Sequence, residues 1–575
     1  MSRSIHAEAW QRHRIRLEGT RKQALETGRN RLLVTSVVFA LAFLAIAGRL
    51  VDLTLLGRGA ESRPAAVAPA RAATSGRADI TDRNGVILAT SLPTVSLYAD
   101  PTEVLDAEEA ADKLVGVLPG LDRSEVLAKL TSRGRFVWLR RTLTPTQQYA
   151  VNRLGIPGLA FQRGEHRVYP HGRTAAHLLG FTDVDGRGIA GLERRFDETL
   201  RRGGPLRLSV DLRLQAMLRQ ELSAAFIGSR ALGAAGLVLD VRNGEILALA
   251  SLPDFDPNRP ATAGGEAGFN RVTKAVYEMG STFKLFTTAM ALDSGTVTLS
   301  DGYDASRPIR VARFTITDFH GRNRWLSVPE ILVYSSNIGA AKMALDVGTR
   351  VQRSYLGNFG LLSRSPIELP EVAPPLIPAR WRDINTMTIG YGHGIAVTLL
   401  QMAGAVATVV NGGIARPTTL LRRPGGIQPG GRRVLSVATS RQMRALMRLV
   451  VLRGTGRGAQ APGYRVGGKT GTADKLEGGR YRSDASISSF VGAFPMNAPR
   501  YVVLILLDEP KGTDGKAATG GRVAAPVVAR MVRRMAPLVG LAPVPGEETP
   551  IGAHPLLASL NAPPAKVREQ PLAAH

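Results

Sequence analysis

The chain has 575 residues, more than one hydrophobic core can organise, so about three to four domain-sized units are expected. Apolar residues make up 44% and charged residues 21%, which excludes a largely disordered protein. The net charge of +27 raises the question of nucleic-acid binding, but no recognised nucleic-acid-binding motif accompanies it, and only eleven of the 74 basic residues are lysine. We interpret the charge as an arginine-rich surface that faces anionic lipid or polymer. The lack of cysteine excludes disulfides, thiolate metal sites and cysteine nucleophiles.

Residues 32–56 are predicted to form a transmembrane anchor. Residues 32–48 carry no charge, and the apolar run continues past Arg49 and Asp52; roughly 20 apolar residues cross a bilayer. Eight basic and three acidic residues precede it, which places the N-terminal tail in the cytoplasm and the rest of the chain outside. The alternative is a cleaved signal peptide, because residues 45–47 resemble a cleavage site. The long leader and the continued apolar run favour an uncleaved, single-pass anchor.

Composition divides the rest of the chain into a linker, two folded regions and a tail. Residues 57–76 are rich in Ala, Arg and Pro and indicate a linker. Residues 77–230 mix strand-like and helical stretches and carry no evident nucleophile and base. Residues 231–540 carry the candidate catalytic residues. Residues 541–575 are rich in Pro and Ala and are predicted to be disordered.

Strand patterns stand at both ends of the region 231–540. Apolar runs at 234–240 and 245–251 are joined through Asn243-Gly244, which is a strong hairpin signal. Two further strand-like runs lie at 487–494 and 501–507. Helical patterns fill the interval at residues 282–293, 338–347 and 399–410. This order predicts an α+β fold in which an antiparallel sheet is flanked by helices.

Ser281 and Lys284 are the first candidate catalytic pair. Gly280 ends a loop, and Ser281 opens an apolar segment with helical spacing, so both side chains are expected on one face. A serine hydroxyl is a poor nucleophile until a base takes its proton. Lysine can be that base once burial and neighbouring cations lower its pKa from about 10.4, whereas arginine stays protonated. Alone, Ser-x-x-Lys is weak evidence, because a capped helix that carries an exposed lysine explains most such tetrapeptides.

Two further motifs follow in the chain. Ser335-Ser336-Asn337 precedes a helical pattern, and alone it reads as an N-cap cluster. Lys469-Thr470-Gly471-Thr472 leads into a strand region. A run of small residues with a lysine there can form an edge where a peptide substrate pairs with the backbone, although alone it also reads as a turn. Neither motif identifies a site without the other.

The ordered triple is far more specific than its parts. Ser-x-x-Lys, Ser-x-Asn about 50 residues later and Lys-Thr-Gly about 130 beyond that form the signature of penicillin-binding proteins and class A β-lactamases. The chain resembles the class B penicillin-binding proteins, and is most similar to the septal transpeptidases. Further segments that carry the resemblance are 77–85, 167–170, 176–177, 191–193, 277–280, 390–394 and 454–456. Ala78 stands where many members have Gly, and Met279 stands where Pro is common.

The resemblance implies a role for each matching residue. Ser281 would attack the carbonyl between the last two D-alanines of a peptidoglycan stem peptide, with Lys284 as general base. Ser335 would relay a proton to the leaving amine, and Asn337 would orient the substrate and Lys284. Lys469 would hold the Ser335 hydroxyl and the substrate carboxylate. Substrate binding and the oxyanion hole would involve Thr470, Gly471 and Thr472, with the backbone N–H groups of Ser281 and Thr472 as oxyanion donors.

The resemblance also implies an architecture and partners. A transmembrane helix would carry an elongated pedestal, residues 77–230, for dimerisation or partner binding, followed by a transpeptidase domain, 231–540, that is similar to serine β-lactamases. The expected partners are stem peptides, β-lactams, the bacterial inner membrane, a SEDS-type (FtsW-like) glycan polymerase and other division proteins. No metal, cofactor or nucleic acid is expected. The catalytic domain would lie in the periplasm at the division septum.

Other members of this class of acyl-serine proteins remain alternatives. An elongation-type transpeptidase or a D,D-carboxypeptidase would share the motifs. A β-lactamase would also need a water-activating base, and none can be assigned in the sequence. A non-enzymatic scaffold or β-lactam sensor is disfavoured because the catalytic positions are intact.

Overall fold

The computed structural model describes residues 33–48, 76–311, 314–423, 430–477, 480–512, 515, 518–544 and 566–567. Two units are described separately, Met1–Thr74 and Ser75–His575. In the first, residues 33–48 form a helix with exposed side chains. Among the residues described, no helix is both long and apolar enough to cross a membrane. The predicted N-terminal tail, the linker up to residue 75 and the rest of the predicted anchor lie outside the described residues, as does most of the predicted C-terminal tail.

A twisted sheet organises the first part of the second unit, which we call the pedestal. Its long strand β2 pairs antiparallel with β1, β3 and β4, while β1 also pairs in parallel with β5. The strands are β1 (Ile80–Thr81), β2 (Ile87–Ala99), β3 (Val137–Leu143), β4 (Leu159–Val168) and β5 (Leu206–Arg207). The helices are α2 (Ala107–Val117), α3 (Arg123–Leu130), α4 (Pro145–Asn152), α5 (Ala176–Leu179), α6 (Gly191–Arg195) and α7 (Asp197–Arg201).

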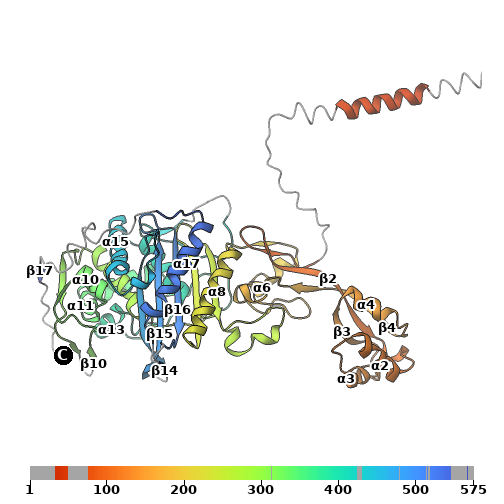
Figure 1. Ribbon diagram of the computed structural model, residues 1–575, viewed down its shortest axis with the longest axis horizontal. Coiled ribbons are helices and arrows are strands. Elements are labelled where there is room, and N and C mark those ends of the chain that lie inside the picture. Colours follow the sequence, from red (N-terminus) through yellow and green to blue (C-terminus); the bar gives the residue numbers. More distant parts are fainter. Residues whose placement is uncertain are drawn as a thin grey trace, which may run out of the picture. The chain divides into compact units, whose positions relative to one another are not determined.

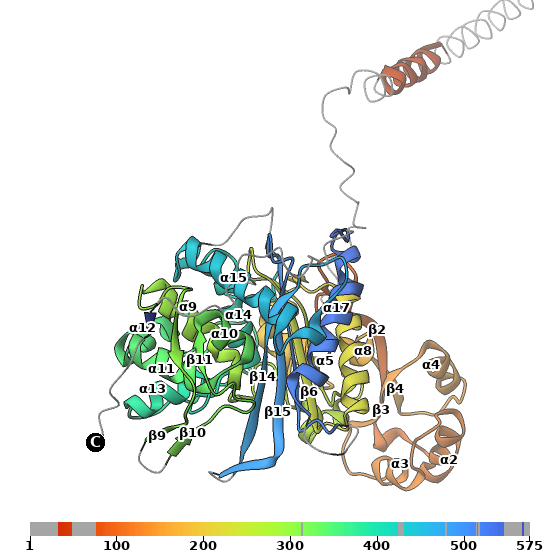
Figure 2. The same cartoon turned by 60° about the vertical axis from the view of Figure 1, so that its left-hand side comes forward.

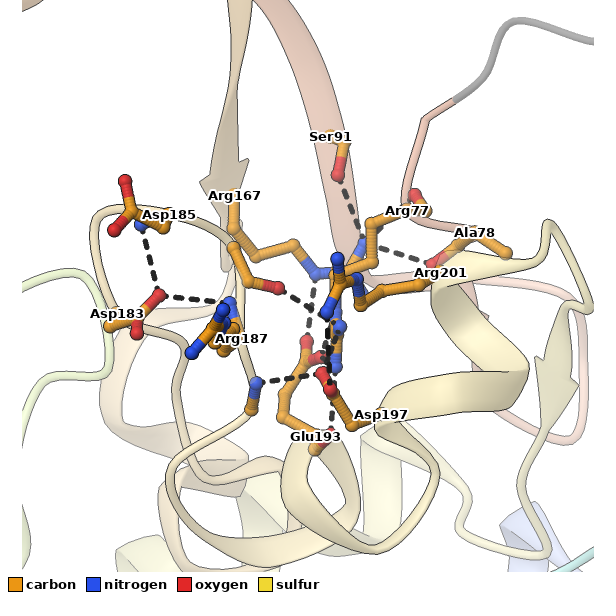
Figure 3. Close-up of polar contacts among 12 residues, drawn as sticks. Arg77, Ala78, Ser91, Arg167, Asp183, Asp185, Arg187, Glu193, Asp197 and Arg201 are labelled. Atoms are coloured by element: carbon orange, nitrogen blue, oxygen red, sulfur yellow. Dashed lines mark hydrogen bonds and ion pairs between the residues drawn. The ribbon is translucent and has the colours of Figure 1, made fainter.

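A buried ion-pair network ties the start of the pedestal to its later helices (Figure 3). Arg77 donates from Nε to Glu193 at 2.6 Å and from Nη1 to Asp197 at 2.6 Å. Arg167 at the end of β4 donates from Nε to the other Glu193 oxygen at 2.7 Å. Arg167 also reaches the backbone carbonyl of Ala78 at 2.9 Å. The Glu193 side chain is fully buried between two buried guanidinium groups, and their positive charges compensate its negative charge.

Glu193→Gln is expected to destabilise the pedestal by about 3–5 kcal/mol, because two buried guanidinium groups lose their shared anion. Chemical denaturation of the full chain measures this change. Glu198→Gln is the matched control, since Glu198 pairs with Arg202 on the surface and its loss should leave stability unchanged. Equal stability of the two variants would show that the buried network contributes no more than a surface pair.

A five-stranded antiparallel sheet forms the centre of the second part (Figures 1 and 2). Its order is β14-β15-β16-β6-β7, so strands from the end of the chain pair with strands from the start of the region. The strands are β6 (Gly233–Asp240), β7 (Ile246–Leu252), β14 (Gly467–Glu477), β15 (Arg480–Phe494) and β16 (Tyr501–Asp508). Within the described residues, the outer edge of β14 has no strand partner. The predicted antiparallel sheet and its Asn-Gly hairpin are confirmed.

Helices cover both faces of this sheet. One face packs against α8 (Leu212–Gly228) and α17 (Ala525–Leu538), which lie side by side. The remaining helices of this part are α9 (Lys284–Asp293), α10 (Val328–Tyr334), α11 (Asn337–Val347), α12 (Thr349–Asn358), α13 (Asp383–Gly390), α14 (Leu399–Val410), α15 (Val437–Arg453) and α16 (Gly520–Val523). The short helix α16 lies beside β14 and β15. Short strands complete the fold: β8 (Asp301–Asp304), β9 (Ile309–Val311), β10 (Phe314–Ile316), β11 (Trp325–Ser327), β12 (Ile414–Ala415), β13 (Arg432–Arg433) and β17 (Lys566–Val567). The mixed α+β fold expected from the sequence is confirmed.

At two of the boundaries expected from the sequence, residues assigned to one region pack against the next region. Helix α8 falls within the residues 77–230 assigned to the pedestal, yet it packs against β6, β7 and α17. Its Gln215 side chain bridges the carbonyls of Thr174 and Leu249 at 2.8 and 2.7 Å, and so joins the pedestal to β7. At the other end, residues 541–544 begin the predicted tail, and the N–H of Val544 donates to the carbonyl of Gly463 at 3.0 Å.

Candidate active site

Ser281 and Lys284 lie at the start of helix α9, where the chain tightens before the helix begins. Ser281 is in a 3₁₀ turn, Gly280–Phe283, and α9 starts at Lys284. The sequence predicts a helix from residue 282, so only the geometry of the first turn differs. A 3₁₀ turn places side chains three residues apart almost above one another. Accordingly, Lys284 Nζ lies 3.0 Å from Ser281 Oγ.

The Lys284 side-chain nitrogen contacts residues of both of the first two motifs. Besides Ser281, it contacts Ser335 Oγ at 3.1 Å, the Ser335 carbonyl at 2.6 Å and Asn337 Oδ1 at 2.7 Å. All these groups can accept a hydrogen bond, and the two hydroxyls can also donate one to a neutral amine. The structure therefore brings the first two sequence motifs together on one nitrogen.

Burial and a neighbouring cation set the charge state of Lys284. Its side chain is fully buried, and burial together with the positive charge of Lys469 lowers the pKa of Lys284 well below its usual value, while Asp318 opposes the shift. Burial disfavours the charged form because an ammonium loses its hydration there. A neutral Lys284 amine has a free lone pair, which is the property that a base for Ser281 requires.

The Ser335–Asn337 turn stands between two helices. Ser335 ends α10 in the left-handed conformation, with φ 61° and ψ 43°, which is uncommon for a residue other than glycine. Ser336 caps α11 by accepting a hydrogen bond from the N–H of Gly339 at 3.0 Å. The left-handed residue turns both the Ser335 hydroxyl and the Asn337 amide towards Lys284.

Lys469 approaches the same hydroxyl from strand β14. Its Nζ lies 2.9 Å from Ser335 Oγ and 3.2 Å from Thr470 Oγ1, and Thr470 Oγ1 in turn lies 2.8 Å from Thr455 Oγ1. Lys469 is fully buried, and burial lowers its pKa to about 7. All three sequence motifs thus meet at Ser335, whose hydroxyl is shared by the two lysines.

Close backbone approaches bring β14 beside Ser281. Gly280 has φ +52°, and a Cβ there would lie 2.7 Å from the carbonyl oxygen of Thr472. Gly392 packs so closely on the Gly280 carbonyl that a side chain at Gly392 would collide with it. Thr472 is exposed and its hydroxyl accepts a hydrogen bond from the N–H of Gly520 at 3.1 Å. Glycine at both positions is therefore required to hold Ser281 against the edge strand.

Three polar residues near the site were not identified from the sequence as functional. Asp318 contacts the Ser335–Asn337 turn. Glu278 accepts hydrogen bonds from the Gly394 N–H at 2.9 Å and from the Tyr481 hydroxyl at 3.0 Å. His393 lies 3.6 Å from Glu278, and burial followed by the charge of Lys284 lowers the pKa of His393 to about 4. The Glu and the His lie in segments that resemble family motifs, but no spacing marks Asp318.

Family comparisons cover both parts of the second unit. The penicillin-binding protein transpeptidase domain matches residues 234–533, and the penicillin-binding protein dimerisation domain matches residues 72–204. The first match includes all three motifs of the site. The second covers most of the pedestal.

Similar proteins extend the match over most of the chain. The probable peptidoglycan D,D-transpeptidase FtsI of Caulobacter vibrioides is 42% identical over 485 residues, which are 81% of this chain and 82% of the relative. Peptidoglycan D,D-transpeptidase FtsI of Escherichia coli is 33% identical, covering 78% of this chain and 82% of the relative. The crystal structure of penicillin-binding protein 3 from Mycobacterium tuberculosis, complexed with ampicillin, is 25% identical with a TM-score of 0.65, covering 82% of this chain and 97% of that one. The chain therefore belongs to the class B penicillin-binding proteins, the family of its peptidoglycan D,D-transpeptidase relatives.

Proposed function

We propose that the protein is a serine-type peptidoglycan D,D-transpeptidase whose nucleophile is Ser281. The observation that carries this proposal is the contact of Lys284 with the Ser281 hydroxyl at 3.0 Å and with the Ser335 hydroxyl at 3.1 Å. Lys284 takes the Ser281 proton while the Ser281 oxygen attacks the carbonyl between the last two D-alanines of a stem peptide. The backbone N–H groups of Ser281 and Thr472 stabilise the oxyanion.

Collapse of the tetrahedral intermediate expels the terminal D-alanine. Its amine receives a proton through the Ser335 hydroxyl, and Lys284 returns to the neutral form. Lys469 and Thr470 bind the substrate carboxylate, and Asn337 orients the peptide. Because β14 has an unpaired outer edge among the described strands, an extended peptide can pair with Gly471 and Thr472 there. An amine from a second stem peptide then attacks the acyl-enzyme and completes the cross-link.

The test separates amine transfer from hydrolysis. The purified full chain is incubated with a donor peptide that ends in D-Ala-D-Ala, with and without a D-amino-acid acceptor, and the products are separated by mass. We expect release of D-alanine together with the acceptor-linked product. Release of D-alanine with water as the sole acceptor would favour a D,D-carboxypeptidase, and no release of D-alanine would contradict the proposed function.

We also propose that residues 32–56 anchor the protein, with residues 1–31 in the cytoplasm and the pedestal and transpeptidase domains in the periplasm. The charge asymmetry before residue 32 supports this orientation, and the helix at 33–48 presents apolar side chains such as Phe39 and Phe43 on its exposed surface. We expect the mature protein to retain its N-terminal residues. Mass-spectrometric determination of the mature N-terminus checks this, and a start near Gly48 would instead indicate a cleaved signal peptide.

The septal role and the partners are inferred from the relatives. The similarity to the two FtsI proteins supports a place in cell division. We propose a SEDS-type, FtsW-like polymerase and other division proteins as partners. Fluorescence microscopy of the tagged protein distinguishes the alternatives. Signal at midcell is expected, whereas signal along the side wall would indicate an elongation-type transpeptidase.

A further inference from the structure

Asp318 is a polar residue at the site that the proposed mechanism does not use. It follows strand β10, the second strand of the β9–β10 hairpin, and so comes from an element separate from helices α9, α10 and α11. Its carboxylate is directed at the turn that carries Ser335 and Asn337. The contacts divide into those that hold the backbone of the turn and those that orient Asn337.

The Asp318 carboxylate caps helix α11 from outside. One oxygen accepts hydrogen bonds from the backbone N–H groups of Asn337 at 2.5 Å and Ile338 at 3.0 Å. The other accepts from the Ser336 hydroxyl at 2.7 Å. Since Ser336 Oγ in turn accepts from the Gly339 N–H, Asp318 and Ser336 together satisfy the first three N–H groups of the helix. A carboxylate at a helix N-terminus is also favoured by the helix dipole.

The same segment fixes the orientation of the Asn337 amide. The carbonyl of Thr317, the residue before Asp318, accepts a hydrogen bond from Asn337 Nδ2 at 2.8 Å. With the nitrogen held there, the amide oxygen is left pointing at Lys284, where it lies 2.7 Å from Nζ. A reversed amide would place its oxygen against the Thr317 carbonyl, so that two acceptors would face each other and this contact would be lost.

The turn needs this support. Ser335 has a left-handed backbone, which for a residue with a side chain costs on the order of 1–2 kcal/mol and persists only when the surroundings over-determine it. Asp318 supplies three of the contacts that hold the residues directly after Ser335. These contacts fix the direction of the Ser335 hydroxyl, which is within hydrogen-bond distance of the side-chain nitrogens of both Lys284 and Lys469.

Asp318 also contributes charge to the surroundings of Lys284. The charged groups that shift the pKa of Lys284 are Lys469 from β14 and Asp318 from the loop after β10. His393, from the loop after α13, is also coupled to Lys284, because the charge of Lys284 lowers the pKa of His393. Burial and Lys469 disfavour the ammonium form, whereas Asp318 favours it. A base that accepts a proton during catalysis needs a nearby negative charge of this kind, because a lysine whose ammonium form is excluded entirely cannot accept the proton.

We propose that Asp318 is a positioning residue for acyl transfer: its carboxylate holds the Ser335–Asn337 turn against Lys284 and balances the positive charge that Lys284 acquires on taking the Ser281 proton. The proton passes from Ser281 to Lys284 and onward through Ser335 to the leaving amine, and Asp318 is not on this path. The inference rests on the proposed function of Ser281 and Lys284.

The experiment measures the second-order rate of acylation of the full chain by a chromogenic cephalosporin across a range of pH. In Asp318→Asn the rate on the pH plateau should fall by about tenfold or more, because one of the carboxylate's acceptor oxygens becomes an amide that cannot accept. The acid limb of the pH profile, where the rate falls as Lys284 becomes protonated, should also move to lower pH, by about one pH unit. The sign follows because removing the anion lowers the pKa of Lys284, so that Lys284 stays neutral to lower pH.

A matched control separates this effect from loss of a helix cap. Asp293 likewise accepts a hydrogen bond from a backbone N–H at the start of a helix, that of Ser436 before α15, at 2.8 Å. Among the described residues, the partners of Lys284 do not include Asp293. Asp293→Asn should lower the melting temperature without moving the acid limb. Asp318→Glu keeps the charge but displaces it by one methylene, so it should lower the plateau and leave the limb where the wild type has it.

The outcomes separate the two proposals. A wild type that is not acylated would contradict the proposed function itself. If the wild type is acylated but Asp318→Asn keeps either its plateau or its acid limb, the positioning role of Asp318 is overturned. If Asp318→Asn does not fold, Asp318→Glu decides, and acylation by that variant at the wild-type rate overturns the same role.

Discussion

Lys284→Arg should abolish acylation by β-lactams, with a loss of about 10³-fold or more in the second-order rate. Arginine keeps the positive charge, but it does not deprotonate in proteins and therefore cannot take the Ser281 proton. General-base catalysis contributes about 10²–10⁴-fold, and the larger guanidinium also displaces Ser335 and Asn337. The measurement is the rate of adduct formation with a soluble β-lactam. A rate within about tenfold of the wild type would show that charge, and not basicity, is what position 284 supplies.

Lys284→Met tests the same role through stability. This variant should lose acylation as completely, yet its melting temperature should equal or exceed that of the wild type. The reason is that burial penalises the ammonium group, and the apolar side chain of Met removes this penalty while filling similar volume. The lost hydrogen bonds to Ser335 and Asn337 offset part of the gain.

The stability difference between Lys284→Met and the wild type should depend on pH with a definite sign. The pKa of Lys284 is lowered in the folded state, so between that pKa and the ordinary lysine value of about 10.4 the unfolded chain binds more protons than the folded one. The stability of the wild type therefore rises with pH across this window. The advantage of the Met variant should be greatest near neutral pH and should shrink in alkaline buffer. Melting curves at several pH values check this, and a constant difference would contradict a lowered pKa.

Ser281→Ala should eliminate covalent labelling by penicillin while the protein remains folded. The result is informative because two hydroxyls lie at nearly equal distances from Lys284, at 3.0 Å for Ser281 and 3.1 Å for Ser335. Ser335 also contacts Lys469 at 2.9 Å, which suits a proton relay, whereas Ser281 lies beside the β14 backbone that would receive the oxyanion.

Peptide mapping by mass spectrometry identifies the acylated residue. In the wild type the adduct should be on Ser281. Ser335→Ala is the control and should still be acylated on Ser281, although about 10²-fold more slowly, because the relay is removed and the nucleophile is kept. An adduct on Ser335 in the wild type or in Ser281→Ala would contradict the mechanism.

Local patterns predicted the elements, and long-range pairing required the structure. The hairpin of β6 and β7 follows from Asn243-Gly244 between two apolar runs, and the α14 pattern at 399–410 matches the helix bounds. By contrast, nothing in the apolar run of β16 indicates that it pairs with β6, because β-strand partners are chosen by the whole fold. The sheet was therefore predictable as a class and its strand order was not.

The site divides in the same way. Ser281 and Lys284 are three residues apart, so a turn of helix is enough to predict their contact. The left-handed backbone of Ser335 carries no signal in the residue type, since glycine and asparagine are the usual residues there. Asp318 contacts Ser336 across 18 residues through a hairpin, and no spacing rule connects them. Residues that support a catalytic turn from another element are visible only once the chain has folded.

The strand order of the central sheet also constrains how the chain can fold during synthesis. The pedestal sheet is complete once β5 (Leu206–Arg207) has been made, but β6 and β7 are apolar and fully buried in the finished protein, and β16 (Tyr501–Asp508) is needed to cover the edge of β6. The apolar hairpin of β6 and β7 therefore stays exposed during synthesis until β16 has been made, more than half a domain later in the chain.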